Sequence, residues 1–203
     1  DMALDVEAAT ALSFRLAAAV DAAPHDERQR AWVRLMTPVT KLWVCKLAPA
    51  LVYEAMECLG GNGYVEDGLL ARIYREVPVN AIWEGSGNVM ALDMLRVLQR
   101  EPDAVAMVLE EIATNATGST ALHDAVARIK GWLSDPQNIE MRARQISEAL
   151  AVLAAATLLN AQAPATVSDA FIATRIGGLP RQLYGQGLQS SDVRGIVDRV
   201  LPS

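Results

Sequence analysis

Apolar residues recur along most of the chain at the three- and four-residue spacing that is typical of amphipathic helices. Near the start, one such face consists of Val6, Ala9, Leu12, Leu16 and Val20. Ala and Leu, which favour helices, are abundant, and alternating strand patterns are nearly absent. We therefore predict an all-α chain.

Two long helices are expected first. One covers residues 2–22 and stops before a proline, because the residue before a proline disfavours helical angles. The next should begin at the N-cap Asp26 and end at Leu59. We expect Pro38 and Pro49 to interrupt or kink it, because each removes one backbone hydrogen bond.

The rest of the sequence predicts shorter helices in two linked units, residues 1–100 and 101–203, with a boundary at Glu101-Pro102. Glycines mark a turn over residues 60–67. Pro78 should end a short helix at Glu76. The further helices are expected at 89–100, 103–115, 120–134, 138–161, 165–176 and 192–201, with a polar stretch at 80–87 and a Gly-rich one at 177–187.

Composition excludes several classes of protein. The chain has 203 residues, 52% of them hydrophobic, which excludes intrinsic disorder. The net charge is −6, shared equally between residues 1–100 and 101–203, so a strongly basic nucleic-acid binder is not expected. No stretch approaches the ~20 uninterrupted apolar residues of a membrane span. We expect a soluble, cytoplasmic protein that does not bind membranes.

The cysteines and histidines do not indicate a disulfide, a metal site or a hydrolase active site. Cys45 and Cys58 have no nearby ligands, so we expect buried, reduced thiols and no disulfide or metal site. His25 and His123 have no Ser or Cys nucleophile at a recognisable spacing, which leaves hydrolase triads without support. The chain opens at Asp1 inside an expected helix, and we interpret it as a fragment or a cleaved form.

The segment Ile82-Trp-Glu-Gly-Ser-Gly-Asn88 places Glu84 between an indole and a glycine, directly before an expected helix. A poorly hydrated carboxylate has a raised pKa, which suits a general base that takes a proton from a weak carbon acid. The amides of the next four residues lie near a helix N-terminus, where unpaired amides bind phosphate or another anion. The alternative is an N-cap loop in which Glu84 complements the helix dipole.

The glycines of Gly60-Gly-Asn-Gly63 are open to two interpretations as well. They form either a helix cap or a turn whose backbone approaches a phosphate closely. A helix rather than a strand precedes them, which excludes the dinucleotide fingerprint.

Three arginines flank the glycine segments. Arg72, Arg75 and Arg96 either meet phosphates or form surface ion pairs with the neighbouring Glu76 and Asp93.

Three stretches carry a family resemblance: Met56-Glu-Cys-Leu-Gly-Gly-Asn-Gly-Tyr64, Leu70-Ala-Arg-Ile-Tyr-Arg-Glu76 and Ile82–Asn88. Their order and spacing resemble the C-terminal helical domain of the acyl-CoA dehydrogenase family. Tyr-Arg-Glu-x-Pro-Val-Asn and Trp-Glu-Gly-Ser-Gly-Asn are similar to its alkylation-response, AidB-type branch. Residues 101–203 resemble the helical extension of that branch more weakly, chiefly through Asp169-Ala-Phe-Ile-Ala-Thr-Arg-Ile-Gly-Gly178.

The resemblance implies a four-helix-bundle-like domain followed by a second helical extension. It implies a flavoprotein in which two further domains, absent from this chain, hold most of the FAD and acyl-CoA surface, so the chain alone should be inactive. Glu84 would be the proton-abstracting base. The Gly-rich turn would meet FAD of a neighbouring subunit in a homo-oligomer, a tetramer. The implied FAD contacts are Gly60, Gly61, Gly63, Ile82, Trp83, Glu84, Gly85, Ser86, Gly87 and Asn88.

Three functions follow from the resemblance. The first is flavin-linked α,β-dehydrogenation of acyl-CoA or a related small molecule, although Trp83 and Ser86 depart from the Tyr-Glu-Gly-Thr of the typical loop. The second is a DNA-binding protein of the alkylation (adaptive) response with a vestigial flavin site. Its double-stranded DNA would meet Arg96, which matches a basic position used in that branch. The third is a structural helical module that acts in oligomerisation.

Overall fold

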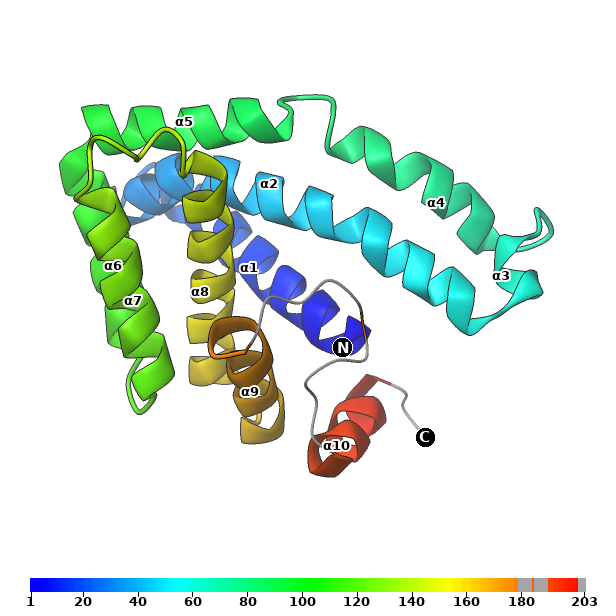
Figure 1. The fold of residues 1–203 in the computed structure, drawn as a ribbon. Coiled ribbons are helices and arrows are strands. Elements are labelled where there is room, and N and C mark those ends of the chain that lie inside the picture. Colours follow the sequence, from blue (N-terminus) through cyan, green and yellow to red (C-terminus); the bar gives the residue numbers. More distant parts are fainter. Residues whose placement is uncertain (179–183, 185–189, 201–203) are drawn as a thin grey trace.

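Helices make up every regular element of the computed structural model, which describes residues 1–178, 184 and 190–200 (Figure 1). The all-α prediction is therefore confirmed. The elements are α1 (Met2–Ala22), α2 (Glu27–Cys58), α3 (Gly61–Tyr64), α4 (Leu69–Asn80), α5 (Gly87–Arg100), α6 (Pro102–Asn115), α7 (Thr120–Leu133), α8 (Ala143–Gln162), α9 (Ala165–Phe171), the π-helical turn η1 (Ile172–Ile176) and α10 (Ser190–Val200).

The central element is α2, which contacts α1, α3, α4, α5, α6 and α8. The carboxylate of its N-cap, Asp26, accepts hydrogen bonds from the amides of Arg28 (2.8 Å) and Gln29 (3.2 Å). The helix continues through Pro38 and Pro49, so neither proline interrupts it, and a kink at either position stays a prediction. Packing on several sides stabilises the helix by more than the two lost backbone hydrogen bonds cost.

Packing also explains why α2 is so apolar. By length and composition α2 could cross a membrane, with a mean hydropathy of 1.2 over an 18-residue window. However, 44% of that window is buried inside the protein. The core helix of a soluble protein has the same properties.

Three helix boundaries differ from those that the sequence predicts. Helix α4 continues through Pro78 to Asn80, because a proline so near the end disturbs only the last turn. Helix α8 begins at Ala143 rather than at residue 138, because residues 136–142 form turns. The helix predicted over 165–176 divides into α9 and η1. Most of the predicted Gly-rich segment 177–187 lies outside the described residues.

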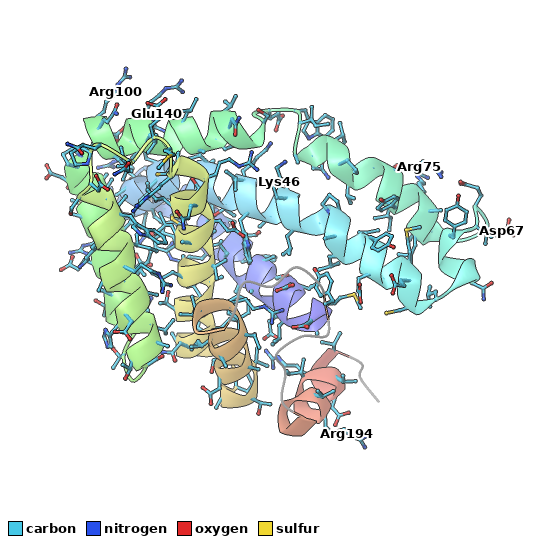
Figure 2. All side chains as sticks on the ribbon, viewed as in Figure 1. Lys46, Asp67, Arg75, Arg100, Glu140 and Arg194 are labelled. Carbon is cyan, nitrogen blue, oxygen red and sulfur yellow. The ribbon has the colours of Figure 1, made fainter. Side chains whose placement is uncertain are left out.

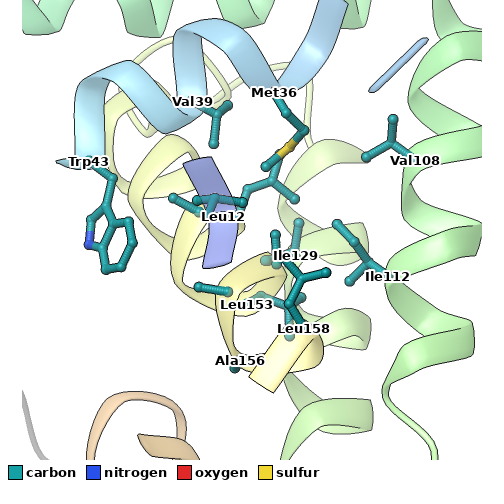
Figure 3. Packing of buried hydrophobic residues seen from close by; sticks show 14 of the residues in the cluster. Leu12, Met36, Val39, Trp43, Val108, Ile112, Ile129, Leu153, Ala156 and Leu158 are labelled. Atoms are coloured by element: carbon teal, nitrogen blue, oxygen red, sulfur yellow. The ribbon is translucent and has the colours of Figure 1, made fainter. Parts of the chain in front are cut away.

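One hydrophobic core joins the two halves of the chain. Figure 3 shows Leu12 and Met36 of the first half packed near Ile112, Ile129 and Leu158 of the second. Helix α5 ends at Arg100 and α6 begins at Pro102, so the chain breaks its helix at the expected boundary while the core continues across it.

The second half of α2, with α3 and α4, extends away from α6 to α9 as a helical arm (Figure 1). In this arm Cys58 is exposed, and Cys45 is only half-buried. The prediction of two buried thiols was therefore wrong. The reason is that α3 and α4 cover α2 here on one side only.

Candidate functional site

The two glycine segments lie at opposite ends of α4. The first contains α3, and the second is the loop of residues 81–86 that leads into α5. The twelve residues of α4 separate them by about 18 Å at 1.5 Å per residue. Figure 2 labels Asp67 at the α3 end and Arg75 midway along α4, with Lys46 farther back on α2. One chain therefore does not bring the two segments together.

The second segment turns sharply at Glu84. This residue has a φ of +53° and is the one non-glycine residue with positive φ within the described part of the chain. Gly85 follows with a φ of +115°. A left-handed conformation is unfavourable for a residue with a Cβ atom, and such strain is concentrated at functional sites.

The expected burial of Glu84 against Trp83 was wrong for this chain. Glu84 is exposed, and Trp83 retains 58% of its accessible surface. Neither side chain is buried by the described part of the chain. The loop packs against α2 with its backbone instead.

The start of α5 leaves its backbone amides available. Ser86 stands at the N-cap position, but its hydroxyl makes no capping hydrogen bond. Met90 donates to the Ser86 carbonyl, and the three amides before Met90 have no recorded backbone partner. A side-chain oxygen of Asn88 accepts a hydrogen bond of 3.0 Å from Arg144 of α8. The first turn of α5 therefore suits an anionic or polar ligand.

The local sequence around Glu84 does not reveal two basic residues of the site. Lys41 of α2 donates from Nζ to the carbonyls of Trp83 (2.9 Å) and Gly85. Arg144, from the second half of the chain, reaches Asn88 in the first turn of α5, directly after this loop. A motif search centred on Glu84 could not find either residue, because only the packing of α2 and α8 brings them to the loop.

The first glycine segment combines an open backbone with one tight contact. Gly60 has a φ of +57°, and a Cβ added at Gly60 or Gly61 would meet nothing within 4 Å. Gly63 is buried, and a Cβ there would lie within 2.8 Å of three backbone atoms of Met56. Gly63 thus allows α3 to pack on α2, while Gly60 and Gly61 leave backbone accessible.

We expect Gly63→Ala to lower the free energy of unfolding by about 1 to 3 kcal/mol, because backbone atoms cannot yield to the added methyl group as a flexible side chain would. Gly61→Ala is the matched control, and its effect should be close to zero or slightly stabilising. Chemical denaturation measures both. Equal stabilities of the two variants would contradict the close contact between α3 and α2.

The arginines near the site form ion pairs at the protein surface. Arg72 pairs with Glu76 at 2.9 Å and Arg96 with Asp93 at 3.7 Å, which confirms the ion-pair interpretation. Arg96 remains exposed on α5, with 55% of its side-chain surface accessible. Its contact with double-stranded DNA stays a prediction.

Arg75 pairs with Glu66 across the turn that joins α3 to α4. Its hydrogen bonds hold the pKa of the Glu66 carboxyl below its usual range. The pair therefore contributes stability above the unfolded pKa, and this contribution is lost as the pH falls through the lower folded value. We expect Arg75→Gln to return the pKa of Glu66 to its usual range in an NMR titration. An unchanged value would mean that Arg75 is not the cause.

Groups of three or more His, Cys, Asp or Glu side chains that could hold a metal ion are not found among the described residues.

Comparison with known proteins gives a consistent relationship. Residues 1–99 match the family described as acyl-CoA dehydrogenase, C-terminal domain. The chain is 46% identical over 153 residues to the putative acyl-CoA dehydrogenase AidB of Escherichia coli, which covers 75% of this chain and 28% of that protein. It is 40% identical over 99 residues to acyl-CoA dehydrogenase family member 11 of Caenorhabditis elegans, covering 47% of this chain and 16% of that protein.

Solved structures agree with this relationship. The apo-form of Bd2924 matches with a TM-score of 0.70 and 28% identity, over 78% of this chain and 31% of that one. The Caenorhabditis elegans ACDH-11 complex with C11-CoA matches with a TM-score of 0.78 over 98% of this chain and 38% of that one, and at 24% identity it shows the common fold.

The match covers a minor part of each relative, since the chain spans 28% of the Escherichia coli protein and 16% of the Caenorhabditis elegans protein. Two of the motifs in the sequence, the Gly-rich turn and the loop around Glu84, fall inside the matched domain. The chain therefore belongs to the acyl-CoA dehydrogenase family, whose C-terminal domain it carries in residues 1–99, and it is related to AidB.

Proposed function

We propose that this chain is the C-terminal part of an FAD-dependent, AidB-type acyl-CoA dehydrogenase in which Glu84 is the base. The observation that carries the proposal is the left-handed backbone of Glu84, with a φ of +53°. Glycine or asparagine would adopt that conformation at lower cost. The presence of a glutamate at this position, despite the energetic cost of the left-handed conformation, indicates that its carboxylate is needed there.

The residues present fit FAD in two respects. The first turn of α5 presents amides that no side chain caps, and these suit the polar edge of a flavin or a phosphate. Gly60 and Gly61 leave backbone with no neighbour within 4 Å of where a Cβ would stand, so a ligand can approach closely. The glycine segments lie at opposite ends of α4, which favours contacts with two different FAD sites in an oligomer.

The proposed reaction removes two hydrogens from an acyl-CoA. A Glu84 carboxylate oxygen takes the proton from the α-carbon, and the electron pair of that C–H bond forms the new double bond. FAD, when bound, accepts the hydride that leaves the β-carbon. The exposed position of Glu84 in this chain suits a base that must reach a substrate held largely by other domains.

The relatives support acyl-CoA as the substrate class. Their names include short-chain specific acyl-CoA dehydrogenase and butyryl-CoA dehydrogenase, and the ACDH-11 structure is a complex with C11-CoA. The decisive experiment mixes the intact flavoprotein with butyryl-CoA or C11-CoA without oxygen. We expect loss of the flavin absorbance with at least one of them. Persistent absorbance with both would overturn the proposal.

We expect the 203-residue chain alone not to retain stoichiometric FAD, because its match covers 28% of the length of the Escherichia coli relative and the chain offers a small part of a cofactor surface. Absorbance spectroscopy of the purified chain after incubation with FAD and gel filtration measures this. A yellow chain with one FAD per protomer would contradict it. A cytoplasmic location and a homotetramer also stay predictions.

A further inference from the structure

The carbonyl groups on either side of Glu84 bind the same ammonium group. Lys41 donates one hydrogen bond to the Trp83 carbonyl at 2.9 Å and another to the Gly85 carbonyl. Lys41 is half-buried and belongs to α2, whose residues Leu42 and Trp43 are part of the hydrophobic core. The backbone around Glu84 is therefore tied to a rigid part of the molecule.

The backbone angles of the loop explain why two carbonyls can meet one lysine. Glu84 and Gly85 have φ values of +53° and +115°, so two consecutive residues of the loop have positive backbone φ angles. A strained conformation persists only where its surroundings determine it. Hydrogen bonds from an ammonium group are stronger than those between neutral groups, and here they join the loop to a residue more than forty positions away.

We propose that Lys41 is a positioning residue for Glu84. It acts through the backbone of Trp83 and Gly85 and holds Glu84 in the left-handed conformation, with its side chain exposed and accessible to a substrate. This inference rests on the proposed function, in which Glu84 takes the α-proton. The Lys41 ammonium faces the loop carbonyls, so Lys41 itself does not contact the substrate.

Lys46 provides a matched control on the same helix. It lies beside the start of α5, where a Cβ added at Gly87 would stand 3.2 Å from its Cε atom. Lys46 is exposed, and no hydrogen bond from its ammonium group is recorded. Lys46→Met therefore removes a nearby positive charge without removing a loop hydrogen bond.

The first test measures the loop directly, by amide hydrogen exchange of Ile82 and Trp83, whose amides donate to the Val79 carbonyl, in the intact flavoprotein. We expect Lys41→Met to accelerate exchange in this loop at least about tenfold, because the loop loses its two links to α2. Lys46→Met should leave exchange at the native rate. Glu84→Gly should reduce the effect of Lys41→Met, because glycine adopts positive φ without strain.

The second test separates positioning from substrate binding. We expect Lys41→Met to lower kcat for acyl-CoA about 10- to 100-fold, since a small displacement of a catalytic group has effects of this size. FAD content and KM should stay within about twofold of the native values. Lys41→Arg, which keeps the charge and at least two donors, should restore most of kcat.

Native exchange and native kcat in Lys41→Met, or equal effects of Lys46→Met, would overturn the inference. Should Lys41→Met fail to yield folded flavoprotein, Lys41→Gln is judged against the same controls. Native turnover in Glu84→Gln would instead refute the part of the proposed function that makes Glu84 the base. In that case the exchange measurement still decides whether Lys41 holds the loop.

Discussion

Glu84→Gln in the intact flavoprotein is expected to lower the rate of acyl-CoA dehydrogenation at least about 100-fold while FAD stays bound. The amide retains the size of the carboxylate and its place on the strained loop, but it cannot accept a proton. Because the substitution changes neither the backbone angles at this position nor the two Lys41 hydrogen bonds, folding and cofactor content should be unaffected.

Rapid mixing with acyl-CoA, followed at the flavin absorbance band, measures this effect. Glu57→Gln is a suitable control, because Glu57 is an exposed carboxylate on the arm that makes no recorded side-chain hydrogen bond. Its rate should equal the native rate. Native turnover in Glu84→Gln would assign the base to another carboxylate, in a part of the protein outside this chain.

Arg175→Met should lower the free energy of unfolding by about 3 to 5 kcal/mol, which is a large fraction of the stability of a domain. Arg175 is buried, with 6% of its side-chain surface accessible, and it lies in the π-helical turn η1. Its guanidinium donates to Asp1 at 2.8 Å and to Asp5 at 2.9 Å, and both carboxylates are at least as deeply buried. Removal of the guanidinium leaves two buried negative charges without this partner.

Thermal and chemical denaturation measure the effect, which corresponds to a decrease in Tm of roughly 10 °C for a chain of this size. Arg199→Met is the control, because Arg199 pairs with Glu7 of α1, the helix that also contains Asp5, but keeps 45% of its side-chain surface exposed. That surface pair should contribute less than about 1 kcal/mol. Similar losses in the two variants would show that burial of the Arg175 pairs is not what matters.

Much of the architecture could be predicted from the sequence, because helices form through contacts between residues three or four positions apart. The spacing of Leu12 and Leu16, the cap at Asp26 and the Arg72 to Glu76 pair all belong to this local range. The motif around Glu84 is equally local, since a strained turn before a helix requires Gly85 directly after the glutamate. Family membership followed from these short segments.

Errors arose where long-range packing outweighed local preference. Pro38 and Pro49 do not interrupt α2, because six other helices contact it and stabilise it. Glu84 and Trp83 are exposed, because the burial of a loop depends on which elements cover it and not on its own residue types.

The interactions that shape the site and stabilise the fold join residues far apart in the chain. Lys41 reaches the Trp83 carbonyl across 42 positions, Arg144 reaches Asn88 across 56, and Arg175 reaches Asp5 across 170. A lysine or arginine on an amphipathic helix has the same local pattern whether its charge meets water, a carbonyl or a buried carboxylate. Its partner is chosen by the way the helices pack, so these three contacts became visible only when α2, α8 and η1 took their places in the fold.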